Sequence, residues 1–179
     1  MKRLKIGCDI DDLLAEFINT YYKRFGIPKN DFEITRNVQN VLRKDQDFWE
    51  NLPVLNRLNF EPELYCTKRV NNKTWTKNWL KKNQFPDKPV YQVYYQKGNK
   101  ANFIKGKVDV FIDDSVSNFI QMNLAGVPCL LYNKPYNQDW GPIGRLFSLD
   151  IKHIKETYAL FMETMFPNFK NLVNEIKRN

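Results

Sequence analysis

The stretch Leu4-Lys5-Ile6-Gly7-Cys8-Asp9-Ile10-Asp11-Asp12 is a short, mostly apolar run that ends in three carboxylates within four positions. Such a run predicts a buried strand, and acids at its carboxyl end lie where open α/β sheets place their ligands. In an extended segment Asp9 and Asp11 point to the same side. Because two carboxylates held together repel each other, the pattern predicts a divalent cation or a shared proton between them. The alternative is a solvated acidic turn after an edge strand.

The composition is that of an ordinary globular protein. The chain has 179 residues, of which 42% are hydrophobic and 27% charged, enough for one domain or for one core with a small insertion. No apolar run approaches the roughly 20 residues that a membrane helix needs, so we expect a cytoplasmic protein without a membrane segment. The cysteines Cys8, Cys66 and Cys129 form no CxxC pair and are expected to be buried thiols. The single histidine, His153, argues against a histidine-rich metal site and against a catalytic triad.

Basic residues outnumber acidic ones by 28 to 20, which gives a formal charge of +8. A positive protein attracts anions such as nucleotides, phosphates or nucleic acid. The basic residues are spread along the chain rather than gathered in one block. The charge therefore supports a small anionic substrate and is only weak evidence for binding of nucleic acid.

Downstream of the first stretch, the sequence predicts helices and then an alternation of strands and helices. Apolar residues recur at helical spacing from Leu13 to Phe25, before Gly26 and Pro28, and weaker helical patterning continues to about residue 58. Later strands are predicted at 64–67, 90–94, 108–112, 129–131 and 145–149, with helices at 73–83, 100–105, after Ser115, and from about 150 onward with a break near Pro167. A loop rich in Pro, Gly and Asn is expected at 132–144.

This alternation predicts an α/β protein with a Rossmann-like parallel sheet. Residues 1–12 and 61–179 are expected to form the core. Residues 13–60 are expected to form a small helical cap, inserted after the first strand. The C-terminal helix is expected to pack on the sheet or on a second subunit, so a homodimer is left open.

The first strand and the strand at 108–112 both end in acids. Because parallel strands share one carboxyl edge, neighbouring positions for these two strands would bring together Asp9, Asp11, Asp113 and Asp114. So much negative charge calls for a hard cation, and oxygen ligands alone favour Mg²⁺.

Two further residues fit a phosphate site at the same edge. Thr67 ends the second strand with a hydroxyl group and backbone N–H groups that suit an anionic oxygen. Lys100 opens a helix just before the fourth strand, so its ammonium group can offset charge on a phosphoryl group. Either residue alone is more commonly an ordinary cap or a surface lysine, and their order along the chain is the argument.

The order of these motifs resembles the haloacid dehalogenase-like superfamily of phosphohydrolases. The matching residues are Asp9-Ile10-Asp11, Thr67, Lys100 and Asp113-Asp114. Within that superfamily the chain is most similar to the 5′(3′)-deoxyribonucleotidases, also called cytosolic type C nucleotidases. Supporting segments are Leu13-Leu14-Ala15-Glu16-Phe17, Phe48-Trp49-Glu50-Asn51-Leu52-Pro53, Phe85-Pro86-Asp87 and Pro135-Tyr136-Asn137.

The chain departs from the superfamily pattern at two positions. Asp12 stands where a glycine often follows the first motif, which adds charge without removing a ligand. Lys68 stands where a small residue commonly follows the threonine, and we expect it to contact the phosphate beside Thr67 and Lys100.

The resemblance implies a magnesium-dependent phosphatase that acts on nucleoside monophosphates, with a preference for deoxyribonucleotides, through an aspartyl phosphate. Asp9 is then the nucleophile, and Asp11 protonates the leaving oxygen and later activates water. Mg²⁺ is bound by Asp9, by the main-chain carbonyl of Asp11 and by the pair Asp113 and Asp114, whose roles the sequence does not rank.

The resemblance also implies that Phe17, Phe48 and Trp49 face the nucleotide base, where stacking contributes roughly 1 to 3 kcal/mol. The alternative is that these aromatic residues form the core of the cap itself. Two other functions stay open: a phosphatase for another phosphomonoester, such as a nucleic-acid 3′-phosphate, and a non-catalytic binding protein. The presence of both Asp9 and Asp11 argues against the last.

Overall fold

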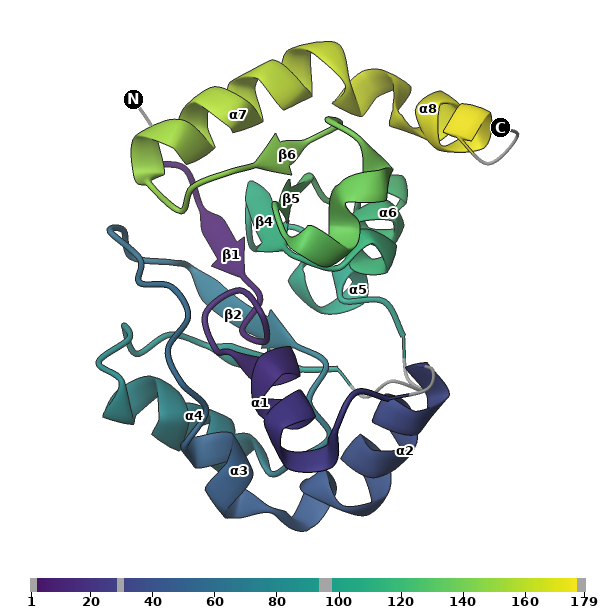
Figure 1. Cartoon of the computed structure of the whole chain (residues 1–179). Helices are drawn as coiled ribbons and strands as arrows, with labels where there is room; N and C mark the ends of the chain where they lie inside the picture. The colour runs from purple at the N-terminus through teal and green to yellow at the C-terminus, as the bar shows by residue number, and fades with distance from the viewer. Residues whose placement is uncertain (1–2, 29–30, 94–97, 177–179) are drawn as a thin grey trace.

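The computed structural model describes residues 3–28, 31–93 and 98–176, and it has the predicted α/β architecture (Figure 1). The described residues form one sheet of six parallel strands in the order β3-β2-β1-β4-β5-β6. This is the strand order of a doubly wound, Rossmann-like sheet, in which ligands bind where the order reverses, beside β1. The predicted fold class is therefore confirmed.

The strands are short and mostly buried. Their bounds are β1 Ile6–Cys8, β2 Leu64–Thr67, β3 Val90–Gln92, β4 Val110–Asp113, β5 Cys129–Tyr132 and β6 Arg145–Leu146. Every residue of β1, β2 and β4 is buried, and strands covered on both faces appear in a sequence as continuous apolar runs. Cys8 pairs with Tyr65 of β2 and with Ile112 of β4, so the carboxyl ends of these three strands are level.

Among the described residues, four helical segments lie between β1 and β2, and the others follow β2. Those before β2 are α1 Phe17–Phe25, α2 Asp31–Asn40, η1 Leu42–Lys44 and α3 Gln46–Glu50; those after it are α4 Lys73–Lys82, α5 Ala101–Ile104, α6 Val116–Leu124, η2 Pro135–Trp140, α7 Ile151–Thr164, η3 Phe166–Asn168 and α8 Phe169–Ile176. Helix α4 packs on β3 and α3, α6 on β4 and β5, and α7 on β6. In Figure 1 the helices before β2 gather at one end of the molecule, and α7 and α8 run along the other. Among the helices of the described residues, none is both long enough and apolar enough to cross a bilayer.

Several predicted caps and ends of helices are observed. The side chain of Asn72 accepts a hydrogen bond from the backbone N–H of Thr74, at 3.0 Å, at the start of α4. Ser115 accepts from the N–H of Asn118 at the start of α6. The C-terminal helix is interrupted by η3, which contains Pro167. Strand β3 ends at Gln92, and position 94 of the predicted strand lies outside the described residues.

Two predictions of local structure were wrong. The helix expected from Leu13 begins only at Phe17, because Leu13, Leu14 and Ala15 are buried in a turn. Ala15 closes this turn by accepting a hydrogen bond at 2.7 Å from the N–H of Asp12, and it forms a bridge with Val54. The apolar spacing thus comes from core packing and not from a helix. The loop predicted at 132–144 contains the 3₁₀ helix η2.

Replacing Gly7 by valine is expected to lower the free energy of unfolding by about 1 to 3 kcal/mol, because the centre of the sheet is tightly packed there. A Cβ atom at this position would lie 2.7 Å from Cδ2 of Phe111 and 3.1 Å from Cγ1 of Val108. Alanine, which adds only the Cβ, should cost less than valine. Urea unfolding followed by tryptophan fluorescence measures both variants, and a valine variant as stable as the wild type would contradict this packing.

Candidate active site

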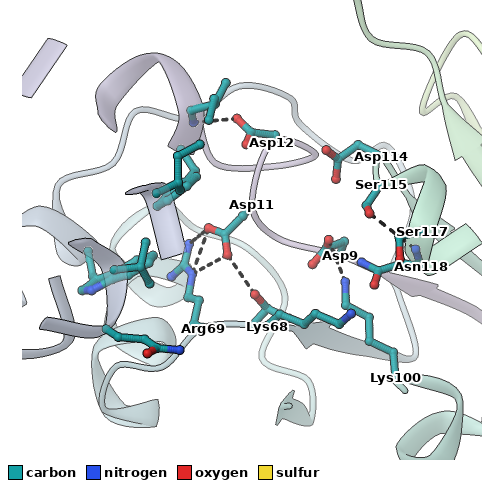
Figure 2. A pocket seen from close by; sticks show the side chains of 17 residues that line it. Asp9, Asp11, Asp12, Lys68, Arg69, Lys100, Asp114, Ser115, Ser117 and Asn118 are labelled. Atoms are coloured by element: carbon teal, nitrogen blue, oxygen red, sulfur yellow. Dashed lines mark hydrogen bonds and ion pairs between the residues drawn. The ribbon is translucent and has the colours of Figure 1, made fainter. Parts of the chain in front are cut away.

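A cavity of about 420 Å³ lies between the carboxyl ends of β1, β2 and β4 and the helices that precede β2 (Figure 2). Its volume lies in the range of small-molecule sites. The core side of the wall is polar and consists of Asp9, Asp11, Asp12, Thr67, Lys68, Arg69, Lys100, Asp114, Ser115, Ser117 and Asn118. The opposite wall is mainly apolar and consists of Phe17, Ile18, Ile34, Val38, Gln39 and Trp49. The cavity therefore has one charged and one apolar side.

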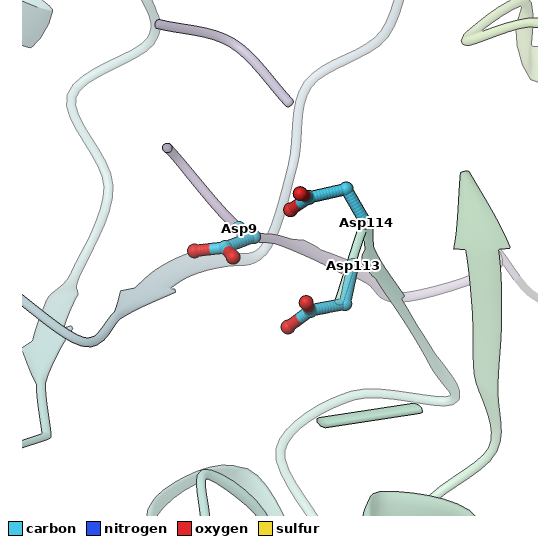
Figure 3. Close-up of side chains that lie close together, drawn as sticks. All are labelled: Asp9, Asp113 and Asp114. Carbon is cyan, nitrogen blue, oxygen red and sulfur yellow. The ribbon is translucent and has the colours of Figure 1, made fainter. Parts of the chain in front are cut away.

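Three of the predicted acids lie together, and two of them, Asp9 and Asp114, line the floor of this cavity. One carboxylate oxygen of each of Asp9, Asp113 and Asp114 lies within 4.8 Å of the other two, and all three residues are buried (Figure 3). The register of the sheet causes this, because β1 and β4 are neighbours and the N–H of Asp9 donates to the carbonyl of Ile112, at 2.9 Å.

Lys100 is the cation of this cluster. Its Nζ lies 2.7 Å from Oδ2 of Asp9 and 2.7 Å from Oδ2 of Asp113, and the side chain is 1% exposed. Burial alone would lower the pKa of Lys100, but Asp113 and Asp9 outweigh it and raise that pKa, so the group stays an ammonium ion. The residue predicted to meet a phosphate thus bridges the two acids in this structure.

The three carboxylates exceed this one ammonium ion by two formal negative charges. Burial raises the pKa of Asp9 well above its usual range, although Lys100 opposes the shift. Burial, together with the charge of Asp113, raises the pKa of Asp114 to about 7. A buried set of oxygen ligands with this excess of charge fits Mg²⁺, which prefers carboxylates.

The two acids after β4 have different surroundings. Asp113 accepts hydrogen bonds from the backbone N–H of Ser115, at 2.9 Å, and from Nδ2 of Asn118, at 3.1 and 3.2 Å, in addition to its contact with Lys100. Asp114 lines the cavity and accepts a side-chain hydrogen bond from Tyr136. Asp114 is thus the acid of the pair that faces the cavity, a distinction that the sequence did not provide.

Asp11 lies at the cavity but outside this cluster. Its carboxylate forms an ion pair with Arg69, with Nη2 2.7 Å from Oδ1, and accepts a hydrogen bond from Oγ1 of Thr67, at 2.9 Å. The expectation that Asp9 and Asp11 point to the same side assumed an extended chain. Strand β1 ends at Cys8, and the turn that follows directs Asp11 toward β2.

Arg69 is the residue of this site that the sequence did not identify. It is 1% exposed, and its guanidinium carbon lies 4.9 Å from the ring centre of Trp49 and 5.8 Å from that of Trp79. Trp49 belongs to α3 and Trp79 to α4, two helices that pack against each other, so this side chain connects both helices to Asp11. Its position two residues after Thr67 was the one available signal.

The three predicted base-facing aromatic residues mostly contact one another. Phe17 stacks on Trp49, with ring centres 5.6 Å apart and planes 11° apart, and Phe48 packs edge-on against both. Phe17 and Trp49 line the cavity, whereas Phe48 is buried behind them. Trp49 is covered by Phe17 and by the nearby Arg69, and it is 1% exposed. Phe17 is only partly buried, so it offers the cavity more ring surface than Trp49 does.

Lys68 and Asp12 complete the polar wall (Figure 2). Burial and the nearby Lys100 lower the pKa of Lys68. Asp12 has a φ of 54° and accepts a hydrogen bond from the N–H of Ile18, at 2.9 Å, at the start of α1. Burial raises the pKa of Asp12 to about 7. Both residues at which the chain departs from the superfamily pattern therefore line the cavity.

No family model matches the chain, and no curated protein matches its sequence.

Replacing Asp114 by asparagine is expected to stabilise the metal-free protein at about pH 8 and to change its stability little near pH 4. The folded-state pKa of about 7 lies above the ordinary value of 3.8. The folded protein therefore holds this proton more tightly than the unfolded chain, and that stabilisation is lost as the pH rises through 7. Asparagine does not titrate, so we expect a gain of roughly 1 to 3 kcal/mol near pH 8.

Thermal unfolding in EDTA across this pH range measures the effect. Asp87→Asn is the control, because Asp87 is exposed and lies outside the cavity wall. An Asp114→Asn variant that is less stable than the wild type near pH 8 would contradict the assigned direction of the shift.

Proposed function

We propose that this protein is a magnesium-dependent phosphatase that hydrolyses nucleoside monophosphates through an aspartyl phosphate. The observation that carries the proposal is the pairing of a buried nucleophile candidate, Asp9, with Lys100 and Asp114 at the floor of a cavity. The opposite wall of that cavity, whose volume is about 420 Å³, offers the aromatic side chains of Phe17 and Trp49. The free, buried thiols support a reducing compartment such as the cytoplasm.

Asp9 and Asp114 would hold a Mg²⁺ ion, and Asp113 keeps Lys100 and the start of α6 in place. A bound Mg²⁺ ion would supply positive charge that offsets the charge of the phosphoryl oxygens and favours the ionised form of Asp9. Burial raises the pKa of Asp9 even beside Lys100, which disfavours the ionised form that attacks phosphorus. This direction supports a metal-dependent activity.

In the first step an oxygen of Asp9 attacks phosphorus, and the bond between phosphorus and the nucleoside oxygen breaks. Asp11 takes up a proton from solvent when it leaves Arg69, and it gives this proton to the leaving oxygen. In the second step Asp11 takes a proton from water, whose oxygen attacks phosphorus and releases inorganic phosphate and Asp9. Thr67, Lys68 and Lys100 donate hydrogen bonds to the phosphoryl oxygens during both steps.

Asp11 is tied to Arg69 and Thr67 in this structure. Proton transfer therefore requires the Asp11 side chain to turn from Arg69 toward the floor of the cavity. Arg69 fixes the position from which this turn begins, because its guanidinium is packed near two indole rings.

The apolar wall supports a nucleoside as the group that leaves. A base that stacks on Phe17 would gain roughly 1 to 3 kcal/mol. Gln39, which also lines this wall, carries both a donor and an acceptor for a base edge. The preference for deoxyribonucleotides is proposed from the resemblance of the motifs.

The purified protein is expected to release phosphate from nucleoside monophosphates in Mg²⁺ and not in EDTA, and Asp9→Asn is expected to reduce this release to background. A colorimetric phosphate assay over ribo- and deoxyribonucleotides with 5′- or 3′-phosphates measures it.

Asp87→Asn again serves as the control and should keep full activity. Absence of magnesium-dependent turnover on every substrate, or full activity in Asp9→Asn, would show the proposal to be wrong. Faster turnover of an oligonucleotide 3′-phosphate than of any monophosphate would identify nucleic-acid ends as the substrate.

Asp11→Asn is expected to lower kcat/KM on nucleoside monophosphates by about 10²- to 10⁴-fold, the usual contribution of a general acid. It should lower kcat/KM on p-nitrophenyl phosphate much less, because nitrophenolate leaves without a proton. This constant reports the step that forms the aspartyl phosphate, so the loss of Asp11 as the base of the second step does not enter it. Arg69→Met should likewise reduce kcat/KM on nucleoside monophosphates more than kcat/KM on p-nitrophenyl phosphate. The difference should be smaller than in Asp11→Asn, because this variant removes only the side chain that positions Asp11.

The ratio of kcat/KM on the two substrates, measured at saturating Mg²⁺, tests this role. Asp9→Asn is the reference, because loss of the nucleophile should affect both substrates alike. An equal loss on both substrates in Asp11→Asn would contradict the role of Asp11 as the acid.

A further inference from the structure

We infer that residues 133–141, here called the strap, together with Arg145 position Asp114 for cation binding. Asn137, Tyr136 and Arg145 are then positioning residues that act through Asp114. The inference rests on the proposed function, because it gives a role to the surroundings of the proposed magnesium ligand.

The strap holds Asp114 by its side chain and by its backbone. The hydroxyl of Tyr136 donates to Oδ2 of Asp114. Nδ2 of the next residue, Asn137, donates to the carbonyl oxygen of Asp114, at 2.9 Å. A hydrogen bond to one carboxylate oxygen restricts the rotation of the group and leaves the other oxygen available for a cation.

Asp114 depends on these contacts because of its place in the chain. Strand β4 ends at Asp113 and helix α6 begins at Val116, so Asp114 belongs to neither element. Figure 2 shows its side chain directed into the cavity, apart from the α6 residues Ser117 and Asn118. Its neighbour Asp113 is held by four donor contacts from Ser115, Asn118 and Lys100, none of which reaches the side chain of Asp114.

Arg145 in β6 holds the strap by several hydrogen bonds. Its Nη1 donates to Oδ1 of Asn133 and to Oδ1 of Asn137, and its Nη2 donates to the carbonyl oxygen of Asn137, each at 2.8 Å. Its Nε donates to the carbonyl oxygen of Gly141, also at 2.8 Å. Within the part of the chain that the structure describes, this 8%-exposed guanidinium has hydrogen bonds to neutral oxygens and no ion pair.

These bonds set the orientation of the Asn137 amide. Its Oδ1 accepts from Arg145 and also from the backbone N–H of Lys134, at 3.0 Å. Its Nδ2 is therefore left to donate to Asp114 and to the carbonyl of Tyr132, at 2.8 Å. A rotated amide would place its NH₂ group against both of these donors, so Arg145 and the N–H of Lys134 together determine that Nδ2 of Asn137 faces Asp114. The buried guanidinium of Arg145 thus acts on Asp114 through Asn137.

Tyr136→Phe tests the inference, because it removes the hydroxyl that holds the Asp114 side chain and keeps the ring. Tyr136 is 55% exposed, so the variant should fold. Isothermal titration of the substrate-free protein with Mg²⁺ is expected to show a Kd about 10-fold higher than in the wild type, within the 10- to 100-fold usual for partners of metal ligands. Arg145→Lys, which cannot make all of the guanidinium contacts, should also raise Kd.

Tyr132→Phe is the matched control, since its hydroxyl donates to Oδ1 of Asn56 and not to an acid of the site. It should leave Kd unchanged. In the phosphatase assay, Tyr136→Phe should raise the Mg²⁺ concentration for half-maximal rate by the same factor and recover most of kcat at saturating Mg²⁺.

Two results would overturn the inference, and they are distinguishable. If Tyr136→Phe binds Mg²⁺ as tightly as the wild type does, the strap does not position the ligand, and the proposed function still stands. If the wild type itself shows no saturable Mg²⁺ binding, both the inference and the proposed metal site are wrong.

Discussion

The contact of Lys100 with both Asp9 and Asp113 is the interaction on which the site depends. The three groups come from the start of α5, the end of β1 and the end of β4, and each is almost completely buried. Burying a charged group without a partner costs free energy. Asp9 and Asp113 can therefore be buried at the ends of β1 and β4 because Lys100 pairs with both. Asp114 adds one more negative charge to the same volume. The sheet thus builds a region whose negative charge Lys100 balances only in part.

Arg69 makes an analogous connection on the opposite side of the cavity. It is also buried, and it pairs with Asp11, the second acid of the first motif. Its neighbours Trp49 and Trp79 lie on helices from the segments before and after β2. A displacement of α3 would therefore disturb the environment of Arg69 and, through it, the position of Asp11. The position of α3 and the orientation of Asp11 are thus linked by this one side chain.

The sequence predicted those parts of the site that follow from regular structure. Asp9 and Asp113 meet because apolar runs mark the strands and parallel strands share a carboxyl edge. The contacts of Arg69 have no comparable signal, because they join segments far apart in the chain and have no period. Leu13 to Ala15 were misread for a related reason: core packing gave a turn the apolar spacing of a helix. Likewise, Tyr136 was visible only as part of a motif, and its contact with Asp114 required the fold.

Asp12 illustrates how a departure from a family pattern is accommodated. The residue has a φ of 54°, in the left-handed region that glycine adopts freely and that aspartate tolerates better than most residues. The backbone conformation explains why glycine suits this position.

The aspartate adds a carboxylate near Asp9 and Asp11, which is unfavourable, but it also accepts a hydrogen bond from Ile18 at the first turn of α1. Glu16, at the N-cap of α1, makes no side-chain cap, so Asp12 supplies that function from the turn after β1. Asp12 therefore links the turn after β1 to the first turn of α1 by a hydrogen bond. This bond fixes where α1 begins relative to Asp9 and Asp11, the proposed catalytic acids.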